Sequence, residues 1–228
     1  MNDMGTETNL QSQKERLLAK IQLHTPINER MKQAFLSVPR EHFVLPKYKD
    51  QAYVDTPLPI LSGQTISAIH MVLIYISPLC TNPQIGERVL EIGAGSGYNA
   101  AMFAEMVAPK NVPNKGHVYA TEIISELSEF AKKNIEQTGY SDRVSVITSD
   151  GGLGYPDQAP YDIISVACSA KSIPEPLIDQ LAPNGRLIIP VGRQFYQDLF
   201  LIKKDEHGKI TKKNLMGVAF VPLTGKFG

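Results

Sequence analysis

The sequence predicts an α/β fold built on a doubly wound, mostly parallel sheet, and three observations support it. Between residues 88 and 192, short apolar segments rich in β-branched residues alternate with segments of helical periodicity, which is typical of βαβ units. Before residue 86 the pattern is helical or irregular, which predicts a helical N-terminal extension. Beyond residue 193, two strands follow one another without an intervening helix, so we expect them to pair antiparallel.

The composition predicts a cytoplasmic protein that binds neither nucleic acid nor membranes. Lys and Arg total 23 and Asp and Glu total 23 of the 228 residues, so no basic excess favours nucleic acid. Cys80 and Cys168 form no C-x-x-C pair, as expected of buried free thiols in a reducing compartment. Residues 1–13 are polar, unlike a signal peptide, and the apolar run at 71–76 is too short to cross a bilayer.

The N-terminal extension is expected to contain two helices and a long ordered loop. The first helix covers Leu10–His24, and the second begins after Asn28, a favourable capping residue, and ends at Ser37. Residues 48–63 contain two prolines and no apolar period, which predicts an ordered loop draped over the domain.

Residues 64–76 lead from this loop into a short helix. Thr65 and Ser67 precede the helix, where a hydroxyl side chain is commonly an N-cap, and the residues alone favour this interpretation over a chemical role. His70 is interpreted as structural. The five histidines are scattered and no H-E-x-x-H spacing occurs, so no metal site is expected.

A glycine motif follows the first strand of the core. Residues 88–92 form that strand, residues 98–107 form a helix, and the turn between them carries Gly93, Gly95 and Gly97. A dinucleotide fingerprint would need a further glycine at residue 98. With Glu91, the motif instead resembles the first motif of S-adenosylmethionine-dependent methyltransferases, whose cofactor carries a sulfonium and an amino group that a nearby carboxylate favours. A tight turn without a ligand is the alternative.

Three acidic residues stand at or near the carboxyl ends of successive strands. Glu91 and Glu122 end the first two strands, and Asp150 follows the third, at 143–148. Because open α/β sheets bind ligands at this edge, the acids predict a cleft, and Glu122 has the place of a ribose-binding acid. The alternative for Glu122 is an acid that interacts with the start of the next helix.

The remaining elements complete the sheet. Further strands are expected at residues 161–167, 186–192, 199–202 and 215–223. Helices are expected at residues 125–138, with Ser125 as the cap, and 175–181. A charged turn at residues 205–209 joins the last two strands.

From about residue 38 to its end, the sequence closely resembles the protein-L-isoaspartate O-methyltransferase family of class I S-adenosylmethionine-dependent methyltransferases. The block Gly63-Gln64-Thr65-Ile66-Ser67-Ala68-x-His70-Met71 is specific to that family, whereas the glycine motif is shared by many methyltransferases. The other matching blocks are Val38–Val44, Asp55–Ile60, Val89–Tyr98, Asp150–Gly154, Ala159–Asp162, Gln180–Gly192 and Phe220–Thr224.

The resemblance implies a protein-L-isoaspartate(D-aspartate) O-methyltransferase with a Rossmann-like methyltransferase fold. Such an enzyme moves a methyl group from S-adenosylmethionine to the α-carboxylate of L-isoaspartyl residues in damaged proteins and peptides, which begins their repair, and releases S-adenosylhomocysteine. One methyltransferase domain would cover residues 1–228, with an extension at 1–85 that shapes the active site, a cofactor-binding core at 86–192 and antiparallel strands at 193–228.

The resemblance also implies the roles of individual residues. The implied catalytic residue is Ser67. The implied cofactor-binding residues are Gln64, Thr65, Ile66, Glu91, Gly93, Gly95, Ser96, Gly97, Glu122, Ile123, Asp150, Gly151 and Thr224. The implied substrate-binding residues are Thr65, Ser67, His70 and Val221.

The implied reaction needs alignment more than it needs a base. A carboxylate is already ionised near neutral pH, so the protein has to align it and exclude water. Ser67 can donate to one carboxylate oxygen, which makes it a positioner rather than a nucleophile. Two residues depart from the family pattern: Ile69 replaces a proline, which predicts a looser loop, and Asn184 replaces a glycine but tolerates left-handed backbone.

Two other functions stay open at this point. One is an S-adenosylmethionine-dependent methyltransferase of RNA or a small molecule, which the neutral charge and the absence of an N-P-P-Y-type motif disfavour. The other is a non-catalytic binding domain, which the intact acids and the intact Ser67 block disfavour. For the preferred function, residues 48–63 and 220–224 are expected to flank an extended peptide.

Overall fold

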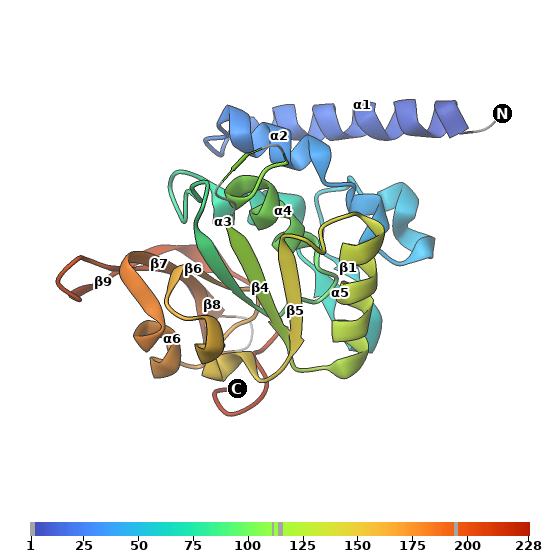
Figure 1. The fold of residues 1–228 in the computed structure, drawn as a ribbon. Coiled ribbons are helices and arrows are strands. Elements are labelled where there is room, and N and C mark those ends of the chain that lie inside the picture. Colours follow the sequence, from blue (N-terminus) through green and yellow to red (C-terminus); the bar gives the residue numbers. More distant parts are fainter. Residues whose placement is uncertain (1–2, 111, 114–115, 194–195) are drawn as a thin grey trace.

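A seven-stranded sheet forms the centre of the computed structural model, which describes residues 3–110, 112–113, 116–193 and 196–228 (Figure 1). The strands are β3 (Arg88–Ile92), β4 (His117–Glu122), β5 (Val144–Thr148), β6 (Tyr161–Val166), β7 (Leu181–Arg193), β8 (Tyr196–Lys204) and β9 (Ile210–Val218). Their order across the sheet is β5-β4-β3-β6-β7-β8-β9. Strands β3 to β7 run parallel, and β8 and β9 continue the sheet antiparallel, which confirms the predicted fold class.

The direction in which strands are added reverses at β3. Its neighbours are β4 on one side and β6 on the other, so the chain first builds outward through β4 and β5 and then crosses over. At such a reversal, the connections that follow the two adjacent strands leave in opposite directions and open a crevice at the carboxyl ends. The crevice therefore lies where β3 and β6 end.

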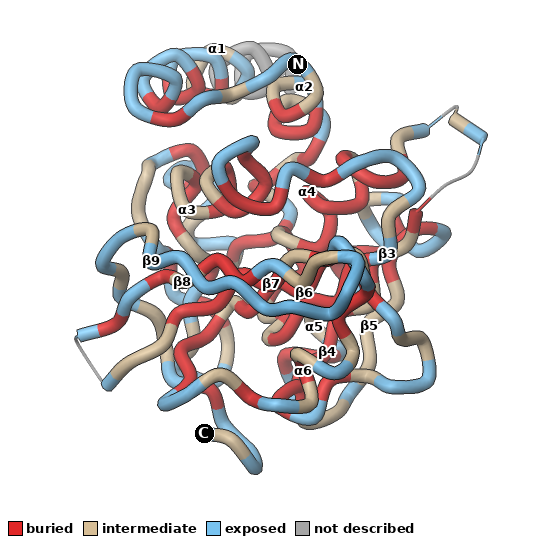
Figure 2. Tube along the Cα trace, turned by 90° about the vertical axis from the view of Figure 1, so that its left-hand side faces the viewer, coloured by how far each residue is buried: buried red, intermediate tan, exposed pale blue. Residues whose placement is uncertain are grey.

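Alternate residues of the central strands point into two different apolar cores. On one face, Val89 and Ile163 belong to the core that holds residues of α3 (Ile69–Ile76), α4 (Tyr98–Val107) and α5 (Ser125–Gln137). On the other face, Leu90 and Ile164 pack with the short α6 (Glu175–Asp179), which contacts the 3-10 helix η4 (Gly151–Leu153). Helices thus cover both faces, but the first layer is much the thicker. Figure 2 shows the buried central strands and the exposed β9 at the edge.

The N-terminal extension packs on the thicker helical layer. Helix α1 (Asp3–Gln22) contacts α2 (Glu29–Ser37), and these two helices lie on the opposite side of the molecule from the C-terminus (Figures 1 and 2). The side chain of Asn28 accepts a hydrogen bond from the backbone N of Met31 at 2.9 Å, which confirms the predicted cap. The 3-10 helices η1 (Arg40–His42) and η2 (Pro46–Gln51) then lead back toward the crevice.

Residues 58–67, which we call the strap, pass beside the crevice. They contain β1 (Leu58–Pro59), η3 (Leu61–Gly63) and β2 (Thr65–Ile66), and β1 pairs with β2 antiparallel. The ordered loop expected over residues 48–63 is therefore built of short helical turns and half of a small hairpin. Helix α3 follows the strap, and its first residue, Ile69, is fully buried. Core packing thus anchors this helix start, at the position where the family resemblance led us to expect a looser loop.

Two features of the helices and turns were predicted with different success. Asn184 has a φ of 62°, which confirms the expected left-handed backbone. The prediction that Ser125 caps α5 is wrong, because α5 begins without a side-chain cap. Instead, the carboxylate of Glu122 accepts a hydrogen bond from the backbone N of Ile124 at 3.0 Å, just before the helix.

Strand β9 starts and ends earlier than predicted. It covers residues 210–218 rather than 215–223, because backbone pairing with β8 includes polar residues whose side chains stay exposed. The following residues leave the sheet edge and return to the crevice. There the backbone N of Ser169 donates to Val221 O and the backbone N of Leu223 donates to Ser169 O, both at 2.8 Å. Across the described ranges, no helix has the length and apolar content needed to cross a membrane.

Candidate active site

The glycine turn at the carboxyl end of β3 has a backbone that other residues rarely adopt. Gly93, Gly95 and Gly97 have φ angles of 87°, 56° and 86°. The backbone N–H groups of Gly93 and Ala94 both donate to Thr121 O, at 2.9 and 3.0 Å, and so tie the turn to β4. The turn therefore brings bare backbone to the edge of the crevice.

Glu122, the last residue of β4, fastens the same turn from its other side. Its Oε2 accepts from the backbone N of Gly95 and its Oε1 from the backbone N of Ile124, each at 3.0 Å. The residue is 6% exposed. Because each carboxylate oxygen can accept more than one hydrogen bond, Glu122 can hold the turn and still accept from a hydroxyl group of a ligand.

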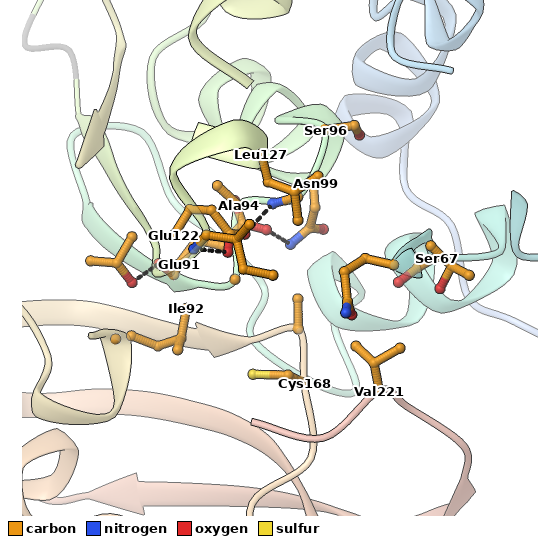
Figure 3. A pocket seen from close by; sticks show the side chains of 18 of the residues that line it. Ser67, Glu91, Ile92, Ala94, Ser96, Asn99, Glu122, Leu127, Cys168 and Val221 are labelled. Carbon is orange, nitrogen blue, oxygen red and sulfur yellow. Dashed lines mark hydrogen bonds between the residues drawn. The ribbon is translucent and has the colours of Figure 1, made fainter. Parts of the chain in front are cut away.

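The crevice contains a cleft, and the glycine turn and Glu122 form one of its walls. Glu91 and Asn99 add two hydrogen-bond acceptors without partners to this wall (Figure 3). Asn99 Nδ2 donates to Glu91 Oε1 at 2.7 Å. Within the described part of the chain, Glu91 Oε2 and Asn99 Oδ1 are buried and have no hydrogen-bond partner. Burial is the main cause that raises the pKa of Glu91 to about 8, and the nearby Glu122 carboxylate adds to it. Since an unsatisfied buried polar group costs about 1–3 kcal/mol, this wall favours a hydrogen-bond donor with positive charge.

The opposite wall comes from two segments that are far apart in the sequence. The strap supplies residues 64–67, and the C-terminal segment supplies residues 221–224. Figure 3 shows Ser67 and Val221 across the pocket from Glu91 and Glu122. The predicted site residues that line this cleft are Gln64, Thr65, Ile66, Ser67, Glu91, Gly93, Gly95, Ser96, Glu122, Ile123, Gly151, Val221 and Thr224.

Three predicted site residues lie outside the lining of the cleft. Gly97 is the N-cap residue just before α4, and an added Cβ there would lie 3.1 Å from Ile135 Cγ1. Asp150 accepts from the backbone N of Gly152 at 2.9 Å and of Lys226 at 2.8 Å, so it joins η4 to the C-terminal segment. His70 lies in a neighbouring groove.

That second groove adjoins the cleft, and Ser67 is one of five residues that line both, with Thr65, Ala167, Val221 and Pro222. The residues around the groove are Pro57, Thr65, Ser67, Ala68, His70, Met71, Ala167, Gln197, Met216, Gly217, Val218, Ala219, Phe220, Val221 and Pro222. Most of these side chains are apolar. Ser67 is partly exposed, and its hydroxyl makes no capping bond to α3. The cap interpretation of Ser67 and of Thr65 is therefore wrong.

Asp55 takes the capping role at α3 and also orients His70. The Oδ1 atom of Asp55 accepts from the backbone N of His70 at 3.0 Å and lies 3.0 Å from its Nδ1. With the Nδ1 proton directed at this carboxylate, His70 Nε2 is left for a ligand in the groove. His70 is thus held in place as a groove residue rather than packed into the core.

Gln197 fixes the far side of the groove. Its Nε2 donates to Phe220 O at 3.0 Å, and its Oε1 accepts from the backbone N of Phe220 at 2.7 Å. Only 5% of Gln197 is exposed. This paired contact determines where the chain leaves β9 and enters the cleft.

Sequence reasoning assigned no role to Asn99, Asp55 or Gln197. Asn99 had a local signal, because it lies in the first turn of the helix that follows the glycine motif and donates a hydrogen bond back to Glu91. Asp55 and Gln197 act on segments 15 and 23 residues away, through single side chains. No periodicity or spacing within either segment reports such a contact.

Comparison with known proteins gives one family. The profile of the protein-L-isoaspartate(D-aspartate) O-methyltransferase family matches residues 12–228. A protein-L-isoaspartate O-methyltransferase of Hyperthermus butylicus is 51% identical over 203 residues, which cover 88% of this chain and 83% of that relative. The enzyme of the same name from Staphylothermus marinus is 52% identical over 202 residues, 88% of each chain. A solved Plasmodium falciparum structure of this kind, in complex with S-adenosyl-L-homocysteine, has a TM-score of 0.79 and 30% identity, and covers 94% of this chain and 97% of its own.

Proposed function

The chain belongs to the protein-L-isoaspartate(D-aspartate) O-methyltransferase family, and on that premise we propose where its two substrates meet. It is an S-adenosylmethionine-dependent enzyme that methylates the α-carboxylate of L-isoaspartyl residues in damaged proteins and peptides. We assign the cleft to the cofactor and the groove to the peptide. The observation that carries this assignment is the position of Ser67, which lines both.

The residues of the cleft fit S-adenosylmethionine. Glu91 Oε2 and Asn99 Oδ1 are buried acceptors without partners, next to the carboxylate of Glu122, and such a wall suits a positively charged donor. Glu91 and Asn99 would hold the amino group, and Glu122 would accept from the ribose hydroxyls. When bound, the cofactor supplies an electrophilic methyl group on its sulfonium.

The other predicted cofactor residues would act in two ways. Those of the cleft lining contact the cofactor directly, namely Gln64, Thr65, Ile66, Gly93, Gly95, Ser96, Ile123, Gly151 and Thr224. Gly97 and Asp150 support the cleft from behind, through the close packing of the turn against α5 and through the bonds between η4 and the C-terminal segment.

Ser67 positions the isoaspartyl carboxylate and does not itself react. The carboxylate is ionised near neutral pH, so no proton has to be removed from it. The Ser67 hydroxyl donates to one carboxylate oxygen, which directs the other oxygen toward the cleft. Thr65, His70 and Val221 line the groove around the same point. With the peptide in place, these walls exclude the water that would otherwise solvate the attacking oxygen.

The groove suits an extended peptide better than a nucleic acid. Met71, Met216 and Phe220 give it apolar sides, while Gly217 leaves room because nothing lies within 4 Å of where its Cβ would be. The formal net charge of the chain is zero, which offers no attraction to a phosphate backbone. Proteins and peptides are therefore the partners we propose.

The three sections of the chain act as one methyltransferase domain, since each supplies part of the cleft wall. Ser67 comes from the extension, Glu91 from the α/β core and Val221 from the C-terminal section. The cytoplasm is the compartment we propose, because Cys80 and Cys168 are both free and buried, as is usual where thiols stay reduced.

The substrate assignment is tested with labelled S-adenosylmethionine and two peptides that differ only in one residue, Asp or isoAsp. We expect base-labile methyl on the isoAsp peptide alone, because only its misplaced carboxylate can reach past Ser67 toward the cleft. Equal labelling of both peptides, or of neither, would contradict the assignment.

The role of Ser67 is tested by Ser67→Ala. We expect near-normal affinity for S-adenosylhomocysteine in calorimetry, and a methylation rate lower by about tenfold or more, because a small misalignment of the carboxylate is costly. Ser62→Ala is the matched control, since Ser62 lies in the same strap and its hydroxyl donates to Glu126 instead. A Ser67→Ala enzyme with normal turnover would remove Ser67 from the mechanism.

A further inference from the structure

Arg40 is a fully buried arginine that connects the two walls of the active site. It lies in η1 and is 0% exposed. Its Nη2 donates to Ser67 O at 2.7 Å, and its Nε donates to Ala52 O at 2.9 Å. Its Cζ lies 4.8 Å from the centre of the Tyr98 ring. One side chain therefore contacts the strap, the loop before it and the start of α4.

The two ends of this connection are functional positions. Ser67 carries the hydroxyl that we assign to the substrate carboxylate, and its carbonyl is the group that Arg40 holds. Tyr98 directly follows Gly97 in the glycine turn and is 1% exposed, so its ring is packed in place beside that turn. A guanidinium is planar and rigid, and it holds partners at fixed angles better than a flexible ammonium does. Arg40 is thus a direct side-chain link between the carbonyl of Ser67 and the residue that follows the cofactor turn.

We propose that Arg40 is a positioning residue for methyl transfer, acting through the backbone of Ser67. Its guanidinium fixes the separation between Ser67 and the glycine turn, and hence between the attacking carboxylate and the methyl group. This inference rests on the proposed role of Ser67. The competing explanation is that Arg40 only fills space in the core and donates to buried carbonyl groups, with no effect on catalysis.

Arg143 shows what a purely structural arginine of the same kind does. It is also 0% exposed, its Cζ lies 4.5 Å from the centre of the Tyr140 ring, and its Nη1 donates to Ala108 O at 3.0 Å. The same Nη1 lies 3.0 Å from Glu105 Oε1. None of these partners lines the cleft or the groove. The two arginines are therefore a matched pair in burial, ring contact and carbonyl contact.

The experiment compares Arg40→Lys with Arg143→Lys, each assayed well below its own melting temperature. For Arg40→Lys we expect kcat with an isoAsp peptide to fall about tenfold, while the Kd for S-adenosylhomocysteine changes by less than about threefold. For Arg143→Lys we expect a comparable fall in melting temperature and a kcat within about twofold of the wild type. Equal losses of kcat in the two variants would show that Arg40 is only structural.

A double variant separates this inference from the role of Ser67 itself. If Arg40 acts through Ser67, adding Arg40→Lys to Ser67→Ala should lower kcat by less than about twofold further. Additive losses in the double variant would overturn the inference and leave Ser67 in place. Normal kcat in Ser67→Ala alone would instead remove the proposed function on which the inference rests.

Tyr53→Phe gives a milder test if Arg40→Lys does not fold. The Tyr53 hydroxyl accepts from the backbone N of Arg40 at 3.1 Å and donates to Glu41, while its ring packs edge-on against Phe35. Loss of the hydroxyl loosens η1 but keeps the packing. We expect kcat to fall about two- to fivefold with unchanged affinity for S-adenosylhomocysteine. Unchanged kcat in this folded variant would count against the proposal.

Discussion

The two walls of the active site are held in place in different ways (Figure 3). The cofactor wall comes from consecutive elements, β3, α4 and β4, and its main bonds are backbone contacts between neighbours in the sheet, such as Gly93 N to Thr121 O at 2.9 Å. The substrate wall comes from the strap and residues 220–224. Its position depends on single side chains from elsewhere, namely Arg40, Asp55 and Gln197.

This difference indicates how each wall responds to substitution. A change in the cofactor wall disturbs the sheet and the turn together, so both stability and cofactor affinity should suffer. A change in one of the side chains that support the substrate wall from elsewhere removes one support of an irregular segment. Turnover or peptide affinity should then suffer more than cofactor binding. Four experiments test this contrast.

The largest effect is expected from Gly151→Ala, in the floor of the cofactor wall. An added Cβ would lie 2.5 Å from Ile92 Cγ2 and 2.6 Å from Thr121 Oγ1, and both of those side chains are buried. Overpacking of this kind costs about 1–3 kcal/mol and displaces the floor, so affinity for S-adenosylhomocysteine should fall about a hundredfold. The measurements are chemical unfolding and calorimetry.

Gly139→Ala is the control for that experiment. Gly139 has a positive φ, of 74°, and nothing lies within 4 Å of where its Cβ would be. This variant should lose about 1–2 kcal/mol of stability through backbone strain and keep its affinity. A folded Gly151→Ala enzyme with normal affinity would show that the floor yields more easily than we infer.

The next effect, on the same wall, is expected from Glu122→Ala. The carboxylate holds Gly95 N and Ile124 N and is placed to accept from the ribose, and hydrogen bonds to charged groups contribute about 1.5–3 kcal/mol. Affinity for S-adenosylmethionine should therefore fall about ten- to a hundredfold. Glu126 is an exposed acid in the first turn of α5, which follows Glu122. Glu126→Ala should change the affinity for S-adenosylmethionine little. Calorimetry that finds normal affinity in folded Glu122→Ala would refute the ribose assignment.

A smaller effect is expected from Gln197→Met, on the substrate wall. Methionine has a similar size but cannot bond the backbone of Phe220, so the segment that lines the groove loses both contacts. We expect the KM for an isoAsp peptide to rise about three- to tenfold, with unchanged affinity for S-adenosylhomocysteine. Steady-state kinetics measures the KM for the peptide, and calorimetry on the same preparation measures the affinity for S-adenosylhomocysteine. A loss of cofactor affinity as large as the rise in KM for the peptide would contradict the contrast between the two walls.

The smallest effect concerns how stability without cofactor depends on pH. Burial raises the pKa of Glu91 from 4.5 to about 8, so the buried carboxyl is stabilised in its neutral form. For a group with a raised pKa, this stability is complete below the unfolded value and is lost as pH rises through the folded value. The melting temperature of the wild type should therefore decline between about pH 5 and 8 more steeply than that of Glu91→Gln. Parallel curves for the two proteins would contradict the assigned ionisation.

The cofactor wall was the more predictable of the two because its signals are local. Strand β3, helix α4 and strand β4 were predicted with the bounds that the structure shows, since apolar periodicity and glycine spacing report on consecutive residues. The cleft at Glu91 and Glu122 followed from the general geometry of parallel sheets. Family resemblance, rather than periodicity, pointed to Ser67.

The substrate wall was less predictable because long-range contacts decide it. Nothing near Ser67 in the sequence indicates that Asp55 caps α3, and so the cap was wrongly assigned to a local hydroxyl. The end of β9 was misplaced for a similar reason. Pairing with β8 extended the strand over polar residues, and Gln197 turned the chain away at Phe220.

The exposed edge of β9 has a consequence for an enzyme that works on damaged proteins. Such substrates carry loosened, extended segments, and an open strand edge is a template onto which they can add and aggregate. Residues 210–214 stay solvent-exposed, and two of them are Lys212 and Lys213. Charged lysines on an edge strand disfavour the docking of another strand. The two lysines therefore make the open edge of this enzyme a poorer template for the extended segments of its substrates.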